Sequence, residues 1–125
     1  MTKQENSNEK WDVQLRKGTL ELVILAALKK RRLYGLELLK LLHSFETMKI
    51  TEGTLYPLMD RLKRDELVSA LWHQEGETRP RKYYQLAQKG EQKLSLLTNR
   101  WRQSVEEIEH IIQHPGPQSI EPKGK

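Results

Sequence analysis

The feature that most constrains the fold of this chain is the order in which its apolar residues change their spacing. Between residues 20 and 64, three segments place apolar residues every three or four positions, as one face of a helix requires. Two short runs rich in Val, Trp and Tyr follow, Leu67 to Gln74 and Arg81 to Leu86, which is typical of a hairpin. A last helical pattern runs from about Gln88 to Ile112. The order predicts a mainly α fold with a small β-hairpin.

The three helical segments have recognisable starts. We expect the first to begin after Thr19 as its N-cap, the second at Tyr34-Gly35 and the third at Thr51. Their apolar faces are Leu20, Val23, Ile24, Ala27 and Leu28, then Leu38, Leu41, Leu42 and Phe45, then Leu55, Leu58, Met59 and Leu62. The first segment is also apolar on its opposite face, at Leu22, Leu25 and Ala26, so we expect a second surface to cover it.

Length and charge limit the classes of protein to which the chain can belong. The chain has 125 residues, enough for one ordinary domain and an appendage. Its net charge is +5, and the excess lies in residues 10–87, with 15 basic and 10 acidic side chains, as expected of a part that meets phosphate. No run approaches the roughly 20 apolar residues of a membrane helix. Cysteine is absent. We therefore expect a cytoplasmic protein without membrane attachment.

Three short helices followed by a hairpin make a winged helix-turn-helix, whose third helix lies in the major groove of DNA. The candidate DNA-binding residues lie at the start and on the polar side of that helix and at the hairpin: Thr51, Glu52, Thr54, Tyr56, Pro57, Arg61, Arg64, Arg79, Arg81 and Lys82. Tyr83 and Tyr84 alternate across a strand, so one should enter the core and the other stay free. The sequence leaves open which.

The last helical pattern carries a seam of apolar residues at alternating steps of three and four, from Leu94 to Ile112. A single seam on a long helix with no net charge needs a partner surface, so we expect a homodimer. The predicted dimerisation residues are Leu22, Leu25, Leu97, Trp101, Val105, Ile108 and Ile112. The predicted organisation is a flexible segment (1–14), the winged helix-turn-helix domain (15–87), the C-terminal dimerisation helix (88–113) and a disordered tail (114–125).

Two motifs resemble the PadR family of bacterial transcription regulators. They are Gly53-Thr54-Leu55-Tyr56-Pro57-Leu58 with Arg61-Leu62, and Arg81-Lys82-Tyr83-Tyr84-Gln85-Leu86 with Gly90. The resemblance covers about residues 15–112, and the Trp101 helix is similar to that of the short subfamily with multidrug-sensing repressors. It implies a dimer that binds double-stranded DNA, frequently as a repressor, until a small aromatic compound binds. It also makes Trp101 a candidate for effector binding, beside the simpler interpretation of Trp101 as dimer core.

Two residues depart from the family pattern. Glu66 stands where the family usually has Gly before the first hairpin strand, so a left-handed backbone there would be strained. Ala87 replaces the usual Thr before the last helix and removes an N-cap worth about 1 kcal/mol.

Other functions fit the sequence less well. The sequence has no nucleophile elbow, His-Glu-x-x-His or phosphate-binding Gly-rich loop, so we expect no enzyme and no cofactor. His110 and His114 have a spacing that can bind a metal with Glu106, but two solvated imidazoles at a helix end are the commoner case, so we predict no metal. A winged-helix protein-protein adaptor is the alternative function. The run Lys29 to Arg32 is interpreted as solvated rather than DNA-bound.

Overall fold

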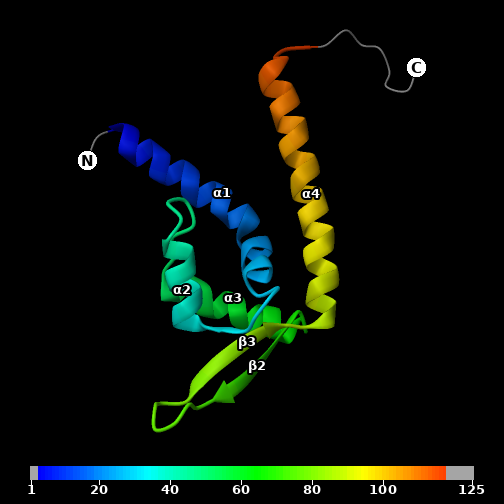
Figure 1. Cartoon of the computed structure of the whole chain (residues 1–125). Coiled ribbons are helices and arrows are strands. Elements are labelled where there is room, and N and C mark those ends of the chain that lie inside the picture. The colour runs from blue at the N-terminus through cyan, green and yellow to red at the C-terminus, as the bar shows by residue number, and fades with distance from the viewer. Residues whose placement is uncertain (1–2, 118–125) are drawn as a thin grey trace. The chain divides into compact units, whose positions relative to one another are not determined.

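The helices and strands follow one another along the chain in the order α1, β1, α2, α3, β2, β3, α4 (Figure 1). The computed structural model describes residues 3–117. The helices are α1 (Lys3–Ala27), α2 (Gly35–His43), α3 (Glu52–Arg64) and α4 (Gln88–Gln113), and the strands are β1 (Leu33–Tyr34), β2 (Val68–His73) and β3 (Arg81–Leu86). The predicted mainly α fold with a hairpin is confirmed. None of the helices in the described range is long and apolar enough to cross a membrane.

The chain forms two compact units that meet between Leu94 and Ser95, inside α4. The core of the first unit is built by α1, α2 and α3. Its fully buried side chains include Ile24, Leu25, Leu28, Leu38, Leu42, Leu55, Met59 and Leu62. The predicted core faces of the first and third helices are therefore largely confirmed.

Two predictions about apolar faces are wrong. Leu25 is 0% exposed in the core of its own chain, so it cannot face a dimer partner. Leu41 and Phe45 are 38% and 56% exposed, whereas Leu39 is buried in place of Leu41. Phe45 is exposed because α2 ends at His43, so Phe45 lies beyond the helix.

Helix α1 begins much earlier than the sequence predicts. It starts at Lys3, so residues 3–14 are helical rather than a flexible segment. Thr19 is inside the helix and not at its N-cap, since its hydroxyl donates to the carbonyl oxygen of Leu15 at 3.1 Å. Residues 118–125 of the predicted tail lie outside the described residues.

The three strands form an antiparallel sheet in the order β1-β3-β2. In this register Trp72 pairs with Lys82, and Tyr34 pairs with Tyr83. Because successive side chains of a strand point to opposite faces, Trp72 and Lys82 share one face and Tyr34 and Tyr83 the other. β2 and β3 form the wing. Figure 1 shows its turn projecting away from the three helices of the first unit.

In the turn from α3 into the wing, a residue other than glycine adopts the left-handed backbone conformation. Glu66 has φ 63°, and the N–H of Leu67 donates to the carbonyl oxygen of Leu62 at 2.9 Å, which closes the helix. The carbonyl oxygen of Leu67 in turn accepts the N–H of Ala87 at 3.0 Å. A Cβ at Gly90 would overlap that same oxygen, so Gly90 lets the start of α4 lie directly against the wing.

Candidate nucleic-acid interface

Helix α3 has one buried face and one exposed face, because its apolar residues recur at helical spacing. Leu55, Met59 and Leu62 are 0% exposed, whereas Tyr56, Pro57, Asp60, Lys63 and Arg64 are exposed. The exposed face therefore presents basic, aromatic and acidic groups together. This arrangement agrees with the helical spacing that predicts the third segment.

The first turn of α3 presents small hydroxyls. Thr51 occupies the N-cap position, and its hydroxyl makes no capping hydrogen bond. It instead donates to the hydroxyl of Thr54 at 3.4 Å, a long and weak contact. Both threonines are exposed. Glu52 also lies in this turn, where the helix dipole stabilises its carboxylate but where the carboxylate would repel phosphate.

Tyr56 is held against the start of α2. Its hydroxyl and ring lie so close to Gly35 that a Cβ at that position would overlap them. The side chain is nevertheless 39% exposed. Gly35 therefore makes room for the Tyr56 ring at the start of α2, while part of the Tyr56 side chain remains exposed.

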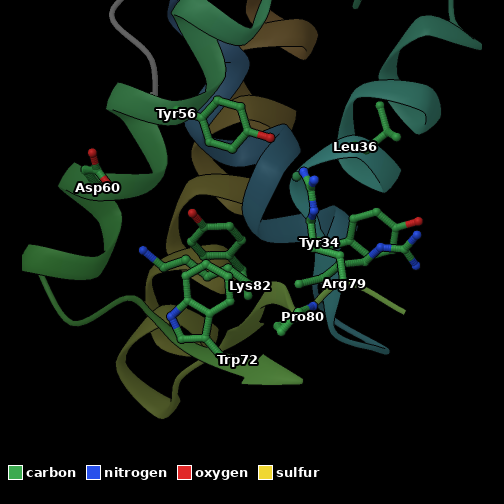
Figure 2. A pocket seen from close by; sticks show the side chains of 11 residues that line it. Tyr34, Leu36, Tyr56, Asp60, Trp72, Arg79, Pro80 and Lys82 are labelled. Carbon is green, nitrogen blue, oxygen red and sulfur yellow. The ribbon is translucent and has the colours of Figure 1, made fainter. Parts of the chain in front are cut away.

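A pocket of about 580 Å³ separates α3 and the start of α2 from the wing (Figure 2). Tyr56 and Asp60 line it from α3, and Trp72 and Lys82 line it from the strands of the wing. Further lining residues are Tyr34, Gly35, Leu36, Arg79, Pro80, Arg81 and Tyr84. Three lining residues are cationic and one is acidic, so the pocket attracts anions.

The two tyrosines of β3 have different surroundings. Tyr84 is 3% exposed, and burial, followed by the nearby Asp60 and Tyr56, raises the pKa of its hydroxyl. Tyr83 is half-buried and meets the ring of Tyr34 edge-on, with centroids 5.3 Å apart. Tyr84 is therefore the core tyrosine that the sequence leaves undetermined.

The predicted basic residues do not all face the pocket. Arg61 pairs with Glu21 of α1 at 2.9 Å and with Asp65 at 3.6 Å, so its charge is compensated within the chain. Arg64 is exposed on the last turn of α3 and does not line the pocket. The structure therefore brings together four of the ten predicted residues around the pocket, Tyr56, Arg79, Arg81 and Lys82. Pro57 does not line the pocket but is exposed beside Tyr56 on α3.

Trp72 and Asp60 are candidate residues that sequence reasoning missed. Trp72 is 69% exposed although it lies in a strand, where a Trp suggests a core residue. Its strand register with Lys82 would have revealed it, but register depends on the turn between the strands. Asp60 could have been found by its place on the polar side of the third segment.

The second unit, described by itself, carries exposed apolar side chains along α4. Trp101, Val105, Ile108 and Ile112 are 46%, 40%, 56% and 64% exposed. The rings of His110 and His114 lie 4.8 Å apart. Among the described residues, no group of three or more His, Asp or Glu side chains is placed to hold a metal ion.

Comparison with known proteins shows which family this chain belongs to. The sequence profile of the transcriptional regulator PadR-like family matches residues 24–96, more than half of the chain. The chain belongs to the PadR-like family of transcriptional regulators. These regulators are winged-helix proteins and not enzymes. The resemblance seen in the sequence is thereby confirmed.

Three solved structures illustrate how far the likeness to PadR-like regulators extends. A PadR-like transcription factor from Bacteroides fragilis is 39% identical, covers 82% of this chain and 98% of its own, and has a TM-score of 0.67. A PadR family regulator from Eggerthella lenta is 29% identical over 88% of this chain and 96% of its own, with a TM-score of 0.77. A PadR-like regulator from Bacillus cereus is 28% identical over 80% and 97%, with a TM-score of 0.74.

Proposed function

We propose that this PadR-like protein is a repressor that binds double-stranded DNA as a homodimer through α3 and the wing. The observation that carries the proposal is the exposed face of α3 opposite a cationic wing, with Tyr56, Lys82 and Arg79 around one pocket. A helix of this kind fits the major groove, and the cations contribute sequence-independent attraction to phosphate. The proposal places the protein in the cytoplasm, where a bacterial chromosome lies.

The homodimer rests on the exposed side chains of α4. Water would otherwise contact Trp101, Val105 and Ile108 along one continuous stripe, which is unfavourable for a soluble monomer. Leu22 of α1 is half-buried and is a candidate for the same interface, together with Leu97 and Ile112.

DNA binding is tested by salt titration of the affinity for a duplex. Counterion release predicts that the logarithm of the affinity falls with the logarithm of the salt concentration, by about 0.9 for each neutralised phosphate. Tyr56→Ala should weaken binding by roughly 1–3 kcal/mol, because one base or phosphate contact is lost. Lys10→Gln is the matched control: it removes an exposed basic side chain on α1 that does not line the pocket, and it should leave the slope unchanged. A flat salt profile would favour the adaptor function instead.

Effector binding is the finer part of the proposal. The 46% exposed indole of Trp101 offers a flat surface for a planar aromatic compound. Such a compound relieves repression only if it prefers the dimer that does not bind DNA, by about 1.4 kcal/mol for each tenfold loss of affinity. Quenching of tryptophan fluorescence by planar dyes should disappear in Trp101→Ala. Unaltered quenching in that variant would leave Trp101 as dimer core.

A further inference from the structure

Trp72 stands out because a large apolar side chain is exposed on the wing itself. Its side chain is 69% exposed, more than that of any other large apolar residue described, and it lies on β2 one residue before the strand ends at His73. Tryptophan side chains are highly buried on average, so an indole exposed on a functional face calls for a binding role.

The surroundings of Trp72 combine an apolar surface with cations. Lys82, its cross-strand partner, extends along the same face, and the Lys82 ammonium lies 5.7 Å from the centre of the Tyr84 ring. Figure 2 shows the indole beside Lys82 on the wing side of the pocket, with Tyr56 of α3 across from it. Arg79 lines the same pocket.

We propose that this pocket holds one sugar-phosphate strand of the bound duplex, with Trp72 packed against deoxyribose while Lys82 and Arg79 bind the flanking phosphates. This inference rests on the proposed DNA binding. If α3 lies in the major groove, one of the two backbones that border this groove must pass between α3 and the wing.

The charges in the pocket place the strand on the wing side. Asp60 lines the opposite wall, and its carboxylate repels phosphate. Lys82 and Arg79 attract phosphate on the wing, where the apolar face of Trp72 meets the C–H groups of the sugar. Sugar and phosphate are the same at every base pair, so this contact adds affinity without reading sequence.

The salt dependence of binding separates the role of Trp72 from that of the cations. Trp72→Ala should lower the affinity roughly five- to tenfold, as the loss of about 40–60 Å² of apolar contact implies. The factor should be equal for a mixed-sequence duplex and for the duplex that the protein selects, and the salt slope should not change. Lys82→Gln should instead reduce the slope by about 0.9, since one phosphate contact is lost.

Three further variants keep the test independent of folding. Trp72→Phe retains an aromatic surface and should recover most of the affinity. Trp11→Ala is the matched control, because Trp11 is 63% exposed on α1, outside the pocket, and should leave the affinity for the duplex unchanged. A variant with Trp72 as its sole tryptophan should show quenched emission when the mixed-sequence duplex is added.

The possible results distinguish the two proposals. Wild-type protein that binds no duplex overturns the proposed function. If the wild type binds and Trp72→Ala binds equally well, DNA binding stands and the role of Trp72 is wrong. A loss confined to the selected duplex also overturns the inference, because it assigns Trp72 to base reading.

Discussion

The winged-helix unit and the second half of α4 use the same apolar spacing with opposite results. In α3, every fourth or third residue is apolar, and Leu55, Met59 and Leu62 are 0% exposed. In α4 beyond Leu94, residues with the same spacing are exposed, as Trp101 and Ile112 are at 46% and 64%. One chain therefore covers the apolar face of α3, whereas the distal half of α4 has an apolar face that one chain leaves in water.

The largest effect is expected from charges placed on the α4 stripe. Val105→Asp combined with Ile108→Asp would bury two carboxylates in the proposed dimer interface, at a cost of roughly 4 kcal/mol or more. Dimer dissociation should rise on the order of a thousandfold. Analytical ultracentrifugation measures this, and circular dichroism should show the helices retained. If the double variant remains as dimeric as the wild type, the apolar stripe on α4 is not the dimer interface, and the proposed contrast between the two regions is wrong.

A smaller effect is expected in the core of the first unit. Met59→Ala removes a fully buried side chain and should lower the free energy of unfolding by about 3 kcal/mol. Leu96→Ala is the matched control on α4, since Leu96 is 57% exposed and lies off the seam, and it should change stability by less than about 0.5 kcal/mol. Urea denaturation at fixed protein concentration compares them. Equal losses would show that exposure in one chain does not separate the two regions.

The smallest effect concerns the strained turn between α3 and the wing. Glu66 holds φ 63°, a conformation that costs a residue other than glycine roughly 1–2 kcal/mol. Glu66→Gly should recover about 1 kcal/mol, because the exposed ion pair with Lys89, at 3.7 Å, contributes little. Glu66→Ala keeps the strain and should bring no gain. Thermal unfolding at constant pH detects the difference. Equal stability of the two variants would show that the left-handed conformation at position 66 costs no stability.

Sequence periodicity predicts the elements whose one face is buried and whose other face is polar. The third helix is found within one residue, since Thr51 is at the N-cap of α3, and the strand from Arg81 to Leu86 is found with the bounds that the structure has. Helix α1 is missed before Thr19 because its first half has no continuous apolar stripe. Strand β1 is missed because two residues are too short to show alternation.

The site is predicted less completely than the fold, because its members meet only through strand register and helix packing. Tyr56 and Lys82 are identified from local pattern, but their pocket depends on the close approach of Tyr56 to Gly35. Arg61 has the right residue type and position, yet Glu21, forty residues away, compensates its charge. No local pattern reveals such a contact.

Hydroxyl-radical footprinting of a selected duplex tests most directly whether two winged helices, joined by α4, bind DNA together. We expect two protected regions, inverted in sequence and separated by about one duplex turn, roughly 34–36 Å. One protected region, or two regions in the same orientation, would contradict it.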